Sequence, residues 1–202
     1  MVAQSQARLK RRIPVVTLTI IGAAVVVCFL PRIHPALVYD RSAILGGELW
    51  RLITGQWVHF SAEHFLYDTL ALGIAGWMIE SRGYPNFGWL CALSPLVIGI
   101  TLLVMEPQLK ICGGLSGVAT AAVVFLTLHG LVEKGAWRWI CLGVLMATAG
   151  KIVYETMTDR FIFVNFTDPS LTLVPASHIA GGLTALAVYL WGKIRRRSRI
   201  AP

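Results

Sequence analysis

The sequence predicts an all-α membrane protein built as a bundle of six membrane-spanning helices. Hydrophobic residues make up 56% of the 202 residues and charged residues only 14%, whereas soluble domains usually carry about a quarter charged residues. The mean hydropathy is correspondingly high, at +0.68. Six apolar runs approach the roughly 17 to 25 residues that a membrane-spanning helix needs. They are 14–31, 59–79, 87–105, 112–131, 137–156 and 174–192.

The first apolar run follows a basic cluster, as the apolar core of a secretory signal peptide does. However, it is about 18 residues long, beyond the 7 to 15 residues typical of such cores, and no small-residue cleavage site follows it. We therefore expect it to be retained as the first span. The predicted layout is a basic cytoplasmic tail at 1–13, a membrane domain at 14–192 and a second basic cytoplasmic tail at 193–202.

The placement of charge predicts the direction of the chain. The net charge of +8 is concentrated in the two tails, which together hold nine of the 18 Lys and Arg residues. Basic clusters beside apolar spans are topology signals, so this placement argues against a nucleic-acid-binding face. Six spans put both termini on one side, and the positive-inside rule places that side in the cytoplasm. The predicted topology is N-in and C-in.

The cysteines do not form a metal-binding pattern. The four of them stand singly, without a C-x-x-C pair or a Cys/His ligand spacing. The sequence therefore predicts no metal and no cofactor.

Three polar residues are expected at a similar depth in the membrane. In the predicted topology, spans two, four and six run in the same direction. His64, Ser116 and His178 each lie about four or five residues from the outer end of their span, and each residue rises 1.5 Å along the helix. Small residues recur every four positions on spans four and six, which favours close helix packing in lipid. These residues are Gly113, Gly117 and Ala121 on span four, and Ser177, Gly181 and Ala185 on span six.

Ser116 and His178 have the chemistry of a nucleophile and its base. A serine hydroxyl becomes an effective nucleophile when a base takes its proton, so a Ser–His pair is the minimum for acyl transfer. The developing oxyanion needs preorganised donors. Backbone N–H groups around Leu115 and Ser116 are candidates, since the first helical turn leaves them unpaired, and His64 could add a side-chain donor. The alternative is a capping serine and a histidine bonded to a neighbouring helix.

These motifs together resemble the rhomboid family of intramembrane serine proteases. The resemblance covers nearly the whole chain and has the motifs in the family's order. They are Trp50-Arg51 before span two, His59 and His64 in it, Gly114-Leu115-Ser116-Gly117, and Ser177-His178-Ile179-Ala180-Gly181. Gly150-Lys151-x-x-Tyr154-Glu155, late in span five, is similar to the rhombosortase branch of the family.

The resemblance implies a rhomboid-like bundle in which Ser116 attacks a peptide carbonyl and His178 acts first as base and then as acid. The Ser116 N–H and the His64 side chain would hold the oxyanion, and Gly114 and Leu115 would contact the substrate. Such an enzyme cuts membrane-anchored proteins in or near their membrane segment. The implied location is the bacterial inner membrane, with the site toward the periplasm. The rhombosortase branch implies substrates with Gly-Gly-type C-terminal anchors.

Asp68 departs from the family pattern. Rhomboids generally have an asparagine four residues after the histidine that corresponds to His64. An ionised carboxylate cannot donate a hydrogen bond, and its charge would repel the oxyanion. Asp68 is therefore a neutral acid donating to the oxyanion, a side chain turned away to pair with His64 or His59, or the mark of a weakened enzyme.

Other residues carry weaker signals. His59 is most simply an interfacial histidine at the start of span two. Lys151 and Glu155 share a helix face and are expected to form an ion pair, with a structural role or a contact to the substrate as the alternatives. Phe161 and Phe163 precede span six and could form an apolar cap that lifts to admit substrate, although aromatic residues often only anchor a helix at the interface.

Two other classes of protein remain open. One is a rhomboid-like protein that binds membrane segments without cutting them, and it would not need Ser116 and His178. The other is a transporter, which would be expected to have repeated halves or broken, charged helices near the midplane. Neither feature is evident in the sequence.

Overall fold

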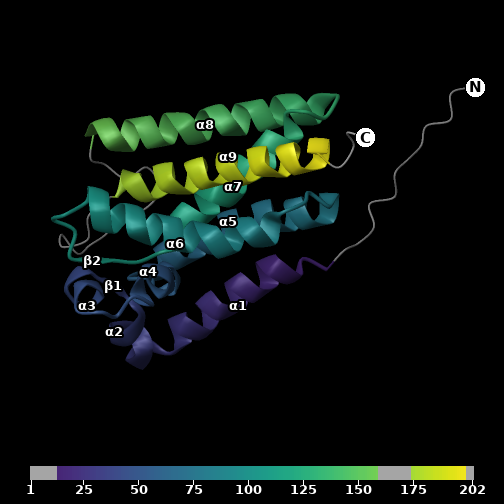
Figure 1. The fold of residues 1–202 in the computed structure, drawn as a ribbon. Coiled ribbons are helices and arrows are strands. Elements are labelled where there is room, and N and C mark those ends of the chain that lie inside the picture. The colour runs from purple at the N-terminus through teal and green to yellow at the C-terminus, as the bar shows by residue number, and fades with distance from the viewer. Residues whose placement is uncertain (1–12, 159–173, 199–202) are drawn as a thin grey trace, which may run out of the picture.

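The computed structural model describes residues 13–158 and 174–198, and these residues form a helical bundle. Its long helices lie side by side, and its short elements gather at one end of the bundle (Figure 1). The long helices are α1 (Val15–Phe29), α5 (Ala62–Arg82), α6 (Phe87–Met105), α7 (Ser116–Gly130), α8 (Ala136–Thr158) and α9 (Pro175–Ser198). Each predicted span therefore corresponds to one long helix, and α6 has the predicted bounds.

The helical architecture is confirmed, but the number of membrane crossings stays a prediction. Within the described residues, α6 and α8 are each long and apolar enough to cross a membrane. Helix α1 also qualifies if it is counted together with the short helices at Pro31–Leu37, which follow it after a bend of 90°. Helix α7 is apolar but has only 15 residues. Charged residues such as Asp68 in α5 and Lys193 in α9 lower the mean hydropathy of the remaining two helices.

Helix α7 is the central element of the bundle. It packs against α5, α6, α8 and α9, and most of its residues are buried. The contact with α9 is especially close, because a Cβ atom added at Gly181 would stand 2.2 Å from the carbonyl oxygen of Gly117. A Cβ atom at Gly117 would stand 3.0 Å from the carbonyl oxygen of Ser177. The predicted small-residue stripes of these two helices therefore meet, as close packing in lipid requires.

The chain between α1 and α5 is folded around a buried arginine. Arg51 donates from Nη1 to the carbonyl oxygens of Pro35 and Val38, at 2.7 Å and 3.0 Å, and from Nε to the Glu48 carboxylate at 2.6 Å. These bonds satisfy a guanidinium that would be costly to bury alone. The short elements of this segment are η1 (Pro31–Ile33), α2 (His34–Leu37), β1 (Tyr39–Asp40), α3 (Arg41–Leu45), α4 (Arg51–Thr54) and η2 (Gly55–Trp57).

A two-residue ladder joins this segment to the chain before α7, and it corrects the predicted start of the fourth helix. Strand β1 pairs antiparallel with β2 (Ile111–Cys112), with Tyr39 opposite Cys112. The fourth helix therefore begins at Ser116 rather than at residue 112. The physical reason is that Ile111 and Cys112 are extended in the ladder and that Gly114 then turns the chain with φ +122°, a conformation that favours glycine.

Helix α1 is attached to α5 by one carboxylate. Glu80 accepts hydrogen bonds from the backbone N–H groups of Val16 and Thr17, at 3.0 Å and 2.9 Å, and from the Thr17 hydroxyl at 2.6 Å. The first N–H groups of a helix have no partner within the helix. Glu80 therefore caps α1 from a neighbouring helix.

Candidate active site

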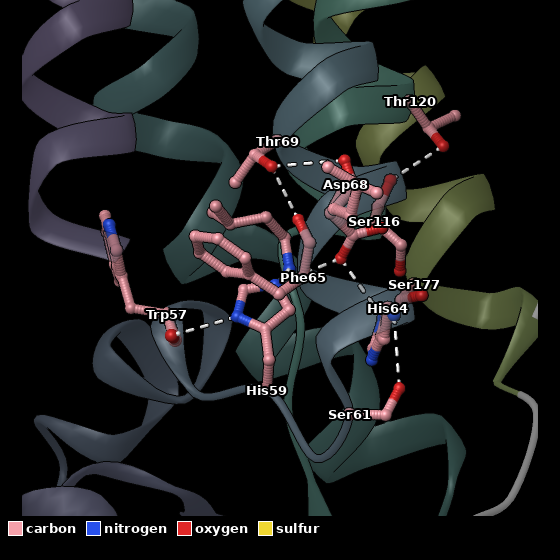
Figure 2. Close-up of polar contacts among 12 residues, drawn as sticks. Trp57, His59, Ser61, His64, Phe65, Asp68, Thr69, Ser116, Thr120 and Ser177 are labelled. Atoms are coloured by element: carbon pink, nitrogen blue, oxygen red, sulfur yellow. Dashed lines mark hydrogen bonds and ion pairs between the residues drawn. The ribbon is translucent and has the colours of Figure 1, made fainter. Parts of the chain in front are cut away.

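Ser116 is the first residue of α7 and follows a tight glycine turn. The turn lies directly against His64 of α5, because a Cβ atom at Gly114 would stand 2.3 Å from Cε1 and 2.5 Å from Nε2 of that ring. Only glycine fits here without moving the histidine. Figure 2 shows His64, Ser116 and Ser177, which belong to α5, α7 and α9, at one level of the bundle.

His178 lies in the first turn of α9, and its side chain is buried. The residue before it, Ser177, contacts Gly117, the residue after Ser116. The crossing of α7 and α9 therefore brings the two predicted catalytic positions together. The structure thus gathers the predicted residues His64, Ser116 and His178 around one crossing, as their similar depth along the sequence suggested.

Asp68 lies one turn below His64 on α5 and faces two histidines. Its Oδ2 atom is 3.1 Å from Nε2 of His64 and 3.2 Å from Nε2 of His59. All three side chains are buried. Of the arrangements considered for Asp68, the structure shows the one in which it pairs with the histidines.

His59, expected as an interfacial histidine at the start of span two, is buried and makes specific polar contacts. The residue lies before α5, not within it, and its side chain is buried. Its Nε2 atom accepts a hydrogen bond from the backbone N–H of Leu115 at 3.2 Å, while its Nδ1 atom is 3.1 Å from the carbonyl oxygen of Trp57. The same Nε2 atom is 3.2 Å from Oδ2 of Asp68, so it accepts from the Leu115 N–H when bare and donates to the carboxylate when protonated. The Leu115 N–H, which is expected as an oxyanion donor, thus already has an acceptor. The side chain of Leu115 is fully buried.

Glu155 of α8 is a second residue that the sequence did not assign to the site. Its Oε2 atom is 2.7 Å from Nζ of Lys151, so the predicted ion pair is confirmed. The same oxygen is 3.2 Å from Nδ1 of His178. The carboxylate is almost completely buried, with 2% of the residue exposed. A signal was present in the sequence, since a glutamate within an apolar helix is unusual, but nothing along the chain indicated its partner.

Two predicted site residues cannot be placed. Phe161 and Phe163, the predicted cap, lie outside the described residues. Within residues 13–158 and 174–198, no group of three or more His, Cys, Asp and Glu side chains is arranged to hold a metal ion. The described residues bring together a serine, a glycine turn and buried His–carboxylate pairs, which are suited to acyl transfer.

Comparison with known proteins agrees with this geometry. The sequence family described as the Rhomboid domain matches residues 46–195, which is well over half of the chain. The rhomboid protease GlpG of Salmonella paratyphi A is 26% identical over 168 residues, which cover 81% of this chain and 55% of that protein. The chain thus spans about half the length of the curated relative that it matches.

Proposed function

The chain belongs to the rhomboid family, and from this premise we propose that it is an intramembrane serine endopeptidase. The observation that supports the proposal is the close crossing of α7 and α9 at Gly117 and Gly181, beside Ser116 and His178 in the sequence. Only an enzyme needs both residues at that crossing. The relative named a rhomboid protease supports the same reaction class.

In the proposed reaction, Ser116 Oγ attacks the carbonyl carbon of the scissile peptide bond. His178 takes the hydroxyl proton as the new C–O bond forms, and the carbonyl electrons move onto oxygen. When the tetrahedral intermediate collapses, the imidazolium gives that proton to the leaving amine. Water then attacks the acyl-enzyme with the same base, which frees Ser116 and releases a carboxylic acid.

The oxyanion is proposed to lie between α5 and the start of α7. Its donors are the backbone N–H of Ser116 and the side chain of His64, which lies against the Gly114 turn. In a site with little water, such fixed donors stabilise the developing charge strongly. Asp68 holds the His64 ring from one turn below and is the residue through which the oxyanion site differs from the family pattern. Gly114 and Leu115 shape the substrate side of the turn.

The proposed substrate is a membrane-anchored protein that is cut in or near its membrane segment. The topology proposed for the enzyme is six spans with N-in and C-in, in a bacterial inner membrane with the site toward the periplasm, since the basic tails favour the cytoplasm. The Gly150-Lys151-x-x-Tyr154-Glu155 pattern supports the rhombosortase branch, and therefore substrates with Gly-Gly-type C-terminal anchors.

A fluorophosphonate probe tests the nucleophile. The purified full chain should be labelled, whereas Ser116→Ala should not be. The matched control is Ser94→Ala, because Ser94 is a buried serine of α6 that only bonds its own helix, to the carbonyl oxygen of Leu90 at 2.7 Å. The same three proteins in liposomes should show Ser116-dependent cleavage of a membrane-anchored reporter with a Gly-Gly-type tail. Equal labelling of Ser116→Ala and the unmodified chain would refute the assignment.

The second candidate is a rhomboid-like protein that binds membrane segments without cutting them. Two observations favour it: a carboxyl group at position 68, and a Leu115 N–H that is bonded to His59 and so turned from the substrate. A binder would retain the intact reporter equally well with Ser116 or with alanine at that position. The protease would release two fragments of the reporter only when Ser116 is present.

A further inference from the structure

Glu155 stands beside His178 on the side of the ring away from Nε2. Its Oε2 atom is 3.2 Å from Nδ1 of His178. Both groups are buried, and Nδ1 makes no hydrogen bond within residues 13–158 and 174–198, so its polar contact there is the ion-pair contact with Glu155. We propose that Glu155 is a positioning residue for His178, so that the site works as a Ser–His–Glu triad. This inference rests on the proposed peptidase function and adds a residue to its machinery.

The carboxylate of Glu155 lies inside the bundle and has two partners, Lys151 and His178. Within α8 only Cys141 and Glu155 are buried, so the helix otherwise presents its side chains outward. In the proposed topology that outer face meets lipid, where a charged pair is costly. Instead, the carboxylate is directed toward α9, and the side chain of Lys151 remains 25% exposed. The buried carboxylate therefore faces His178 as well as its own helix.

A carboxylate at Nδ1 performs two tasks in acyl transfer. It holds the tautomer with the proton on Nδ1, which leaves Nε2 as the acceptor for the Ser116 hydroxyl proton. It also stabilises the positive charge that the ring gains in the transition state. Glu155 takes up no proton itself. The proton passes from Ser116 Oγ to His178 Nε2 and then to the leaving amine.

Lys151 completes the arrangement. Its ammonium group is 2.7 Å from the same Oε2 atom, so it fixes the carboxylate and offsets its charge. Without Lys151, the carboxylate would be buried beside a neutral imidazole before the reaction begins, which is unfavourable. Lys151 therefore acts through Glu155, two steps from the reacting atoms.

The test compares Glu155→Gln, Glu155→Asp and the unmodified full chain in detergent micelles. The measurements are kcat and KM on the membrane-anchored reporter and the rate of fluorophosphonate labelling of Ser116. In serine proteases with a Ser–His–Asp triad, the corresponding acid-to-amide change lowers kcat about 10⁴-fold. We expect Glu155→Gln to lower kcat and the labelling rate at least about 10-fold with KM unchanged. Glu155→Asp should recover part of the loss.

The matched control is Glu80→Gln, which removes a carboxylate that joins α1 to α5 away from the site. It should lower the melting temperature and leave the labelling rate unchanged. Unchanged kcat and labelling in Glu155→Gln would overturn the proposal. Equal losses in the Gln and Asp variants would overturn it too, because a carboxylate would then have no advantage over an amide. Neither result would change the Ser116-dependent labelling of the unmodified chain. The absence of that labelling would instead refute the peptidase function.

A spectroscopic measurement tests the pair without relying on activity. In the Ser116→Ala protein with ¹⁵N-labelled histidine, the His178 signals should show a proton on Nδ1 and a bare Nε2. Adding Glu155→Gln should shift the ring toward a mixture of tautomers. A proton found on Nε2 while Glu155 is intact would overturn the proposal, even if the Gln variant folds poorly.

Discussion

The crossing of α7 and α9 leaves no room for a side chain at position 181, and Gly181→Ala tests how far catalysis depends on that distance. The added Cβ would stand 2.2 Å from the Gly117 carbonyl oxygen, where ordinary contact begins near 3.4 Å. This oxygen belongs to the backbone of a packed helix, so relief requires the two helices to separate by about 1 Å. This movement would also separate Ser116, which adjoins Gly117, from His178, which lies one turn before Gly181.

A misplacement of about 1 Å in a reacting pair can lower the rate about 10²-fold, which corresponds to about 2.7 kcal/mol in the barrier. We therefore expect Gly181→Ala to lower the fluorophosphonate labelling rate of Ser116 by about that factor. Overpacking should also lower the free energy of unfolding by about 1 to 3 kcal/mol. Labelling is the preferred assay because a small probe depends little on how a long substrate binds.

The neighbouring glycine supplies the control. A Cβ atom at Gly182 would meet only Cγ2 of Val124, at 3.8 Å, which is ordinary van der Waals contact. Gly182→Ala should therefore keep the labelling rate and gain slightly in stability, because alanine favours the helix. The reasoning fails if the folded Gly181→Ala protein has a labelling rate within about threefold of that of Gly182→Ala. The α7–α9 distance would then not set the Ser–His geometry.

Three further predictions concern Asp68 in the site and two buried contacts elsewhere in the bundle. Asp68→Asn should keep at least the original kcat, because the amide retains an acceptor for the histidines and removes a charge that opposes the oxyanion; a loss above about 100-fold would show that the carboxylate itself is required. Arg51→Lys should lower the free energy of unfolding by about 1 to 3 kcal/mol, because lysine cannot reproduce the fork that binds Pro35, Val38 and Glu48, and limited proteolysis of residues 34–58 should accelerate. Glu80→Gln should cost about 1 to 3 kcal/mol in the same measurement, since an amide N–H₂ would then face donors of α1; an unchanged melting temperature would contradict its capping role.

The helices and the main site positions could be predicted from the sequence because each depends on a local pattern. Apolar runs located all six long helices, since burial or lipid exposure requires that length of apolar chain. The regular spacing of Gly117 and Ala121, and of Gly181 and Ala185, indicated which faces would meet. Similar depth along three helices then predicted that His64, Ser116 and His178 would gather, because depth follows from residue count alone.

The missed features depend on pairing between distant segments. The β1–β2 ladder needs only two residues from each strand, too few to leave a periodic pattern in the sequence. Glu155 was recognised as an ion-pair partner of Lys151 because four residues on one helix share a face. Its contact with His178 depends on how α8 is rotated against α9, which no local spacing determines. His59 was missed because its partner, the Leu115 N–H, is a backbone group and has no sequence signature.

The two buried carboxylates of the site have opposite relations to the charges that develop in the proposed reaction. Each lies beside groups that can carry positive charge, Asp68 next to His59 and His64 and Glu155 next to Lys151 and His178, which offsets part of the cost of burying an anion.

Glu155 faces the ring that becomes positive, so its charge stabilises the transition state. Asp68 lies behind the ring that is proposed to hold the oxyanion, so its charge opposes the transition state unless the two histidines offset it. Removing one charge by Glu155→Gln should therefore slow the reaction, whereas removing the other by Asp68→Asn should not. Similar effects of these two isosteric changes would mean that the carboxylates serve burial and packing alone.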